Sequence, residues 1–175
     1  MRKILLVIDM QKDFVDGALG TAEAVAASAH VRQKIQSFDA ADVFATMDTH
    51  FADYMDTQEG HFRPVPHCIK GTEGWELHES VRDLLRDVRI FEKSSFGSGE
   101  LVRYLCDLRA EEELEIEIVG LCTDVCVVTH ALMLKALMPE VRITADASCC
   151  AGITPEGHRA ALQTMRACQI VLTNE

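Results

Sequence analysis

The chain alternates short runs of apolar residues with longer stretches in which apolar residues recur at helical spacing. The runs are rich in aliphatic and β-branched side chains, which is typical of strands buried on both faces. We expect strands at residues 3–9, 43–47, 88–92, 114–119, 141–145 and 169–173. We expect helices at residues 21–38, 77–86, 99–109, 123–138 and 155–167, the last with Pro155 in its first turn.

Strands that alternate with helices predict an α/β fold: a doubly wound, mostly parallel six-stranded sheet, Rossmann-like, with helices on both faces. The sequence contains no internal repeat, low-complexity tract or linker, so we expect a single domain over residues 1–175. Residues 48–74 form a long predicted loop that contains Pro64, Pro66, Gly60 and Gly71. A loop of that length inside a compact domain is usually functional.

Composition narrows the class of protein. Hydrophobic residues make up 48% of the chain and charged residues 26%, which is typical of a folded globular protein. The net charge of −11 disfavours binding to nucleic acid or to anionic membranes. No apolar run is long enough for a membrane span, and the first run is too short for a signal peptide. Seven cysteines without regular spacing indicate free thiols in a reducing compartment, so we expect a cytoplasmic protein.

Reactive side chains follow four of the predicted strands at their carboxyl ends. Asp9 follows the first strand, Asp48 and His50 the second, Lys93 the third, and a Gly-Leu-Cys-Thr-Asp-Val-Cys segment ending at Cys126 the fourth. Parallel sheets bind ligands beyond the carboxyl ends of their strands. The sequence therefore predicts that carboxylate, imidazole, ammonium and thiol groups meet at one edge.

Cys126 is the candidate nucleophile, because it falls in the first turn of a predicted helix, where the helix dipole lowers the pKa of a thiol. Asp9 is the candidate base, and Lys93 would orient Asp9 and stabilise the thiolate. Each residue alone has an ordinary structural explanation: a buried cysteine, a helix cap and a surface charge. The three together at strand ends favour nucleophilic catalysis.

Three segments resemble the signatures of the isochorismatase-like cysteine hydrolases: Ile-Asp-Met-Gln-Lys-Asp-Phe at 8–14, Lys-Ser-Ser-Phe at 93–96 and Gly-Leu-Cys-Thr-Asp-Val-Cys at 120–126. Their order and spacing match that family over nearly the whole chain. The resemblance implies that Asp9, Lys93 and Cys126 form a catalytic triad. It also implies a cis peptide between Leu121 and Cys122, with the amides of Cys122 and Cys126 forming an oxyanion hole.

Within that family, Asp-Thr-His at 48–50 and the segment around His67 resemble the nicotinamidase branch. This resemblance implies one divalent metal ion held by Asp48, His50 and His67, with Glu59 as a further candidate ligand and His61 as its local competitor. Spacing of two on an extended strand end places Asp48 and His50 on the same side. Zinc is the favoured metal, and iron or manganese suits the same ligands.

The nicotinamidase resemblance implies a substrate with a pyridine ring, which needs an aromatic side chain to pack against. Thr49 stands where the nicotinamidase branch often has tryptophan, so an aromatic wall must come from elsewhere. Phe14 is the first candidate, with Phe96 or Trp75 as alternatives. We expect Phe14, Phe96 and Leu121 to contact substrate.

The resemblance predicts a metal-dependent amidohydrolase that converts nicotinamide to nicotinate and ammonia through a thioester, a step of NAD salvage, and a protein that self-associates. The alternative within the fold is a metal-free hydrolase of another amide, carbamoyl compound or vinyl ether. A catalytically silent binding protein is a rival of another class. A dinucleotide-binding oxidoreductase would need a glycine-rich turn after the first strand, which residues 9–14 lack.

Overall fold

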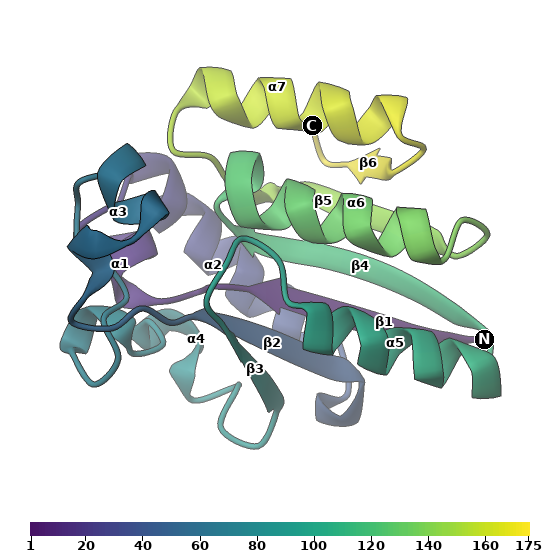
Figure 1. Cartoon of the computed structure of the whole chain (residues 1–175). Helices are drawn as coiled ribbons and strands as arrows, with labels where there is room; N and C mark the ends of the chain where they lie inside the picture. Colours follow the sequence, from purple (N-terminus) through teal and green to yellow (C-terminus); the bar gives the residue numbers. More distant parts are fainter.

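The computed structural model describes residues 1–175 and contains one six-stranded sheet with helices packed against it (Figure 1). The strands are β1 (Arg2–Ile8), β2 (Val43–Asp48), β3 (Arg89–Lys93), β4 (Leu114–Leu121), β5 (Arg142–Ala151) and β6 (Val171–Thr173). The α-helices are α1 (Lys12–Val15), α2 (Ala22–Gln36), α3 (Gln58–Phe62), α4 (Glu79–Arg82), α5 (Gly99–Glu111), α6 (Val128–Leu137) and α7 (Pro155–Ala167).

The strand order places β1 and β4 next to each other at the centre of the sheet. The order is β3-β2-β1-β4-β5-β6, and every neighbouring pair is parallel. The direction of winding reverses between β1 and β4, and such a switch point is where doubly wound sheets bind ligands. The predicted α/β fold is confirmed.

Alternate side chains of β1 enter two separate cores. Ile4, Leu6 and Ile8 pack in the core that includes residues of α5, α6 and α7. Leu5 and Val7 pack in the other core, with residues of α2 and with Val81 of α4. All five side chains are fully buried. Burial on both faces explains why this strand is continuously apolar in sequence.

The long helices begin at polar caps that the sequence supplies. The side chains of Thr21, Ser98 and Thr154 accept hydrogen bonds from backbone N–H groups in the first turns of α2, α5 and α7. Such caps satisfy N–H groups that have no partner within the helix. They fix where each chain segment leaves the carboxyl edge of the sheet.

Several predicted boundaries are wrong. The helix expected at 77–86 is only the short α4, which begins after the cap made by the His78 side chain. The strand expected to end at residue 145 continues to Ala151, because buried Asp146 is neutralised by Lys34 at 2.8 Å. Helix α1 was not predicted, since four residues are too short for a periodic pattern. The long loop contains the equally short α3.

The lengths and compositions of the helices also decide whether one of them could cross a membrane. None of them combines the length and the apolar character that a membrane crossing needs.

Candidate active site

Lys93 lies at the centre of the site, at the end of β3. Its Nζ is 2.7 Å from Asp9 Oδ2, 3.1 Å from Asp48 Oδ1 and 3.4 Å from Cys126 Sγ. All four residues are buried. One ammonium group therefore contacts the predicted base, the predicted nucleophile and a predicted metal ligand.

Asp9 follows β1 in a left-handed backbone conformation, with φ of 46°, which aspartate tolerates better than most residues. Thr46 of β2 donates a hydrogen bond from Oγ1 to Asp9 Oδ1 at 2.6 Å. Asp9 Oδ2 is buried and accepts no hydrogen bond of regular geometry, although it is ion-paired with Lys93. That oxygen is available to take a proton.

Cys126 lies in a π-helical turn at Thr123–Val127, which precedes α6. The sequence predicted a continuous helix at 123–138, and this part of the prediction is wrong. The carbonyl of Cys122 accepts hydrogen bonds from the N–H groups of both Val125 and Val127, and the second of these, which spans five residues, makes the turn wider than an α-helical one. The turn sets the direction of the cysteine side chain at the end of β4.

The junction of β4 and this turn has the predicted cis peptide between Leu121 and Cys122. Gly120, with φ of 118°, precedes it. A Cβ at position 120 would collide with the carbonyl oxygen of Ile8. Glycine therefore allows β4 to pass close to β1, next to Asp9.

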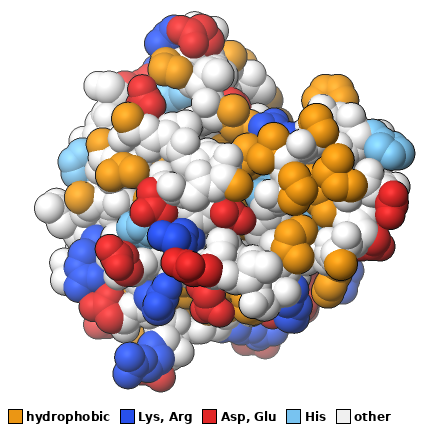
Figure 2. Space-filling view, turned by 90° about the vertical axis from the view of Figure 1, so that its left-hand side faces the viewer, with side chains coloured by type: hydrophobic (Ala, Val, Ile, Leu, Met, Phe, Trp, Pro, Cys, Tyr) orange, Lys and Arg blue, Asp and Glu red, His pale blue; other side chains and the backbone are white.

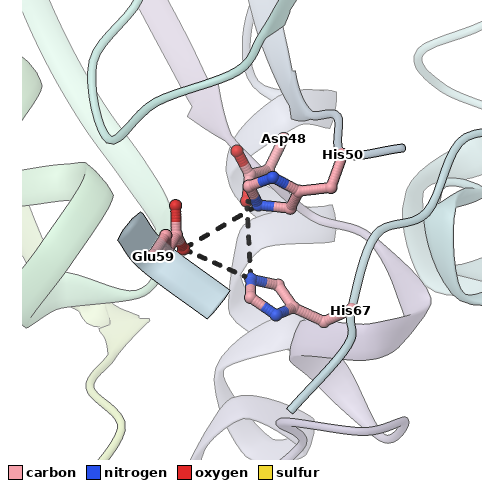
Figure 3. Close-up of side chains that lie close together, drawn as sticks. All are labelled: Asp48, His50, Glu59 and His67. Carbon is pink, nitrogen blue, oxygen red and sulfur yellow. Dashed lines mark hydrogen bonds and ion pairs between the residues drawn. The ribbon is translucent and has the colours of Figure 1, made fainter. Parts of the chain in front are cut away.

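Four side chains beside Lys93 converge in the arrangement of a metal site (Figure 3). One donor atom from each of Asp48, His50, Glu59 and His67 lies within 4.8 Å of the others. His67 Nε2 is 3.7 Å from both Asp48 Oδ2 and Glu59 Oε1, and His50 Nε2 is 3.0 Å from Asp48 Oδ2. Two of the ligand candidates come from the end of β2 and the residues after it, one from α3 and one from the following loop.

Hydrogen bonds outside the cluster orient its donors. His67 donates from Nδ1 to the carbonyl of Val65 at 2.8 Å, which leaves the lone pair of Nε2 facing the cluster. The Gln11 amide bonds both the N–H and the C=O of Asp48, at 2.7 and 2.8 Å. Two imidazoles and two carboxylates, held at these separations, fit a divalent transition metal.

The isochorismatase domain family matches residues 3–175. The chain belongs to the isochorismatase family. It is 30% identical to the isochorismatase family protein PncA of Bacillus subtilis, over 93% of each chain. It is 28% identical to the nicotinamidase/pyrazinamidase of Mycobacterium tuberculosis, over 97% of each chain.

Solved structures agree with this assignment. The nicotinamidase/pyrazinamidase PncA of Bacillus subtilis has a TM-score of 0.84 and 28% identity, with 99% of this chain and 100% of that chain covered. The pyrazinamidase of Pyrococcus horikoshii, in complex with zinc, has a TM-score of 0.80 and 28% identity over the whole of both chains. This member of the isochorismatase family is a nicotinamidase-like amidohydrolase.

The pocket of this isochorismatase-family chain contains most, but not all, of the predicted substrate contacts. Phe14 and Phe96 line a narrow pocket together with Asp48, His67 and Cys126. Leu121 does not line it, so its predicted contact with substrate stays a prediction that the pocket lining does not support. Leu121 points the same way as Val119, two residues earlier on β4, and both are fully buried in the core beneath α2.

Two alternative candidates lie away from the pocket. Trp75 donates its indole N–H to Thr49 at 3.0 Å and does not line the pocket. His61 is exposed and is not part of the four-residue cluster, whereas Glu59 is. The geometry favours Glu59 over His61 as a candidate ligand, because these side chains leave α3 in different directions.

Sequence reasoning missed Thr46 and Gln11. Each polar side chain is fully buried and bonds a residue of the site. A signal for Thr46 existed: it lies two residues before Asp48 on β2, so it faces the same side of the sheet. Gln11 follows a strand end and has no comparable signal.

The electrostatics of the site differ from the expectation for a helix N-terminus. Burial and the neighbouring Asp9 raise the pKa of the Cys126 thiol well above its ordinary value, against the opposing effect of Lys93. Burial would lower the pKa of Lys93, but Asp9, Cys126 and Asp48 together outweigh it and raise that pKa. Burial and Asp9 therefore oppose ionisation of the Cys126 thiol, which is consistent with a need for a neighbouring base.

Proposed function

We propose that this protein hydrolyses a heteroaromatic carboxamide, with nicotinamide converted to nicotinate and ammonia, as a metal-dependent enzyme. One observation supports this most directly: Lys93 Nζ contacts Asp9, Cys126 and Asp48 at once. The acyl-transfer groups are thereby held next to the four-residue metal cluster. Relatives described as nicotinamidase/pyrazinamidase support the choice of substrate.

Asp9 and Cys126 carry the proposed acyl transfer. Asp9 takes the thiol proton, and Cys126 Sγ attacks the amide carbon. Asp9 then passes that proton to the departing nitrogen, the C–N bond breaks, and ammonia leaves a thioester on Cys126. Asp9, again a carboxylate, accepts a proton from the water that attacks the thioester and returns it to the departing thiolate. The free thiol and nicotinic acid result, and the acid ionises to nicotinate.

Other groups orient and stabilise the reacting amide. The backbone N–H groups of Cys122 and Cys126 would hold the oxygen on which negative charge develops. Phe14 would pack against the ring, since it lines the pocket and lies edge-on to His67 with ring centroids 5.5 Å apart. Asp48, His50, Glu59 and His67 would hold the divalent metal, which when bound offers a coordination site for the ring nitrogen and so positions the substrate.

The deciding experiment measures ammonia released from nicotinamide by the metal-loaded protein, with and without a chelator. We expect release that chelation abolishes, that added zinc restores, and that Cys126→Ala eliminates. Release that is unaffected by thorough metal removal would favour a metal-free hydrolase. Absence of release from nicotinamide, with turnover of another amide, would contradict the proposed substrate. A cytoplasmic location and self-association stay predictions from the sequence.

A further inference from the structure

The narrow pocket opens into a larger hollow on the face that carries α3. The hollow has a volume of about 570 Å³ and shares four lining residues with the pocket: Glu59, Arg63, Phe96 and Val125. Figure 2 shows this face, and hydrophobic side chains gather on one part of it. A volume of several hundred Å³ is ordinary for a site that holds a drug-sized ligand. The hollow therefore has room for a substituent on the substrate ring.

Arg63 is the only cationic residue that lines either the hollow or the pocket. Its guanidinium forms no ion pair and donates no hydrogen bond to the protein, although it is half-buried. The carboxylates around it have other partners. Glu59 faces His50 and His67, at 3.8 and 3.7 Å, and Asp124 accepts the N–H of Ile153 at 3.0 Å.

The backbone at Arg63 is held firmly. Its N–H donates to the carbonyl of Glu59 at the end of α3, and its own carbonyl accepts a hydrogen bond from the Tyr54 hydroxyl at 2.9 Å. Tyr54 is almost fully buried. The guanidinium is also close enough to the nucleophile's turn to oppose the rise in the pKa of Cys122. An unpartnered cation thus extends from a fixed point toward the reacting centre.

A free guanidinium presents donors in a planar fork that matches a carboxylate. Ser94, Ser95 and Gln58 add neutral polar side chains to the wall of the same hollow. We propose that Arg63 is a specificity-determining residue that selects carboxamides carrying a second, negatively charged group, which lies in the outer hollow. The inference rests on the proposed function and extends it from a bare ring to a class of anionic ring amides.

The ring nitrogen constrains where the charged group is attached. If that nitrogen faces the metal cluster and the carboxamide faces Cys126, only ring carbons remain free to carry a substituent. The matching probe is 5-carbamoylpyridine-3-carboxylate. Its methyl ester has nearly the same shape without the charge, and nicotinamide lacks the substituent.

The test compares kcat/KM for the carboxylate and its methyl ester, in the metal-loaded enzyme and in Arg63→Met. We expect the unaltered enzyme to prefer the carboxylate by about tenfold or more, as a charge-assisted hydrogen bond would give. Arg63→Met should remove that preference, and Arg63→Lys should retain part of it. Arg103→Met removes the same charge from an exposed position on α5 and should leave both the preference and the basal rate unchanged.

The outcomes separate this inference from the proposed function. Equal kcat/KM for carboxylate and ester in the unaltered enzyme, or a preference that persists in Arg63→Met, would overturn the role of Arg63. Turnover of the carboxylate without turnover of nicotinamide would overturn the proposed substrate alone. If no amide is hydrolysed, calorimetry with pyridine-3,5-dicarboxylate and nicotinate applies the same comparison to binding, and tighter dicarboxylate binding lost in Arg63→Met is the result expected.

Discussion

At the scale of single residues, Lys93 links two kinds of chemistry. Its ammonium group is ion-paired both with Asp9, the proposed base, and with Asp48, a candidate metal ligand. A buried ammonium costs much free energy unless anions surround it, and Asp9 and Asp48 meet that need. The proposed base and the candidate metal site are therefore electrostatically dependent on each other.

Thr46 offers a test of how Asp9 is held. Thr46→Val preserves shape but removes the hydrogen bond to Asp9 Oδ1, so we expect kcat to fall about tenfold while KM changes little. Thr46→Ser should retain most of the rate. Steady-state ammonia release measures both variants.

The matched control is Thr144→Val, the same change at a buried position on β5 away from the site. It should leave kcat at the level of the unaltered protein. A Thr46→Val enzyme with full kcat would show that Lys93 alone positions Asp9.

Residue-scale prediction from the sequence worked where chemistry and position coincided. Asp9, Lys93 and the cysteine turn stand at strand ends, so their meeting could be inferred from topology alone. The pKa direction of Cys126 could not, because it depends on how completely the folded chain buries the sulfur.

At the scale of elements, the short helix α3 positions residues of both the candidate metal site and the pocket. Its cap, Thr57, accepts the N–H of Gly60 at 3.0 Å, and Gly60 lies so close to the Tyr54 carbonyl that any Cβ would collide with it. This packing fixes α3 against the preceding turn. It presents Glu59 to the histidines and ends at Arg63 beside the pocket.

The metal site can be tested through this helix. Glu59→Ala should lower the affinity for zinc at least tenfold, because it removes a donor from the cluster. His61→Ala, two residues along the same helix and exposed, should leave that affinity unchanged. Competition with a chromophoric chelator measures both, independently of activity. Equal affinities in the two variants would mean that Glu59 is not a ligand.

Elements were predictable in proportion to their length and regularity. Apolar runs indicated all six strands, most clearly β1 and β2, whose residues are almost all buried. The single-turn helices α1 and α3 were missed because four or five residues cannot show a period of 3.6. The extension of β5 depends on the partner of Asp146, which comes from α2 and is invisible locally.

At the scale of the whole molecule, stability in acid should depend on His130. This histidine is fully buried, donates from Nδ1 to the Cys126 carbonyl at 2.7 Å and accepts the N–H of Ser98 at Nε2, at 2.9 Å. Both ring nitrogens are engaged as in neutral imidazole, and burial lowers the pKa of His130 in the folded state. Below a pH of about 6.5 the His130 imidazole therefore binds a proton in the unfolded chain, whereas in the folded chain it stays neutral to a lower pH.

The direction in which stability changes with pH follows from this difference in proton binding. The stabilisation is present above the ordinary histidine pKa and is lost as the pH falls below it, so the urea midpoint should decrease between roughly pH 7.5 and pH 5.5. In His130→Gln the decrease should be smaller, whereas exposed His61→Gln should behave like the unaltered protein. Chelator in every sample removes the contribution of bound metal. Parallel decreases in all three proteins would exclude His130 as the source.

The arrangement of the sheet has a practical consequence for handling the protein. All six strands run the same way, so the chain enters β1 at the rim remote from the site, and Met1 is 80% exposed there (Figure 1). A fusion partner, affinity tag or sensor surface attached at Met1 would thus leave the opening of the pocket beside α3 accessible to small molecules in the medium.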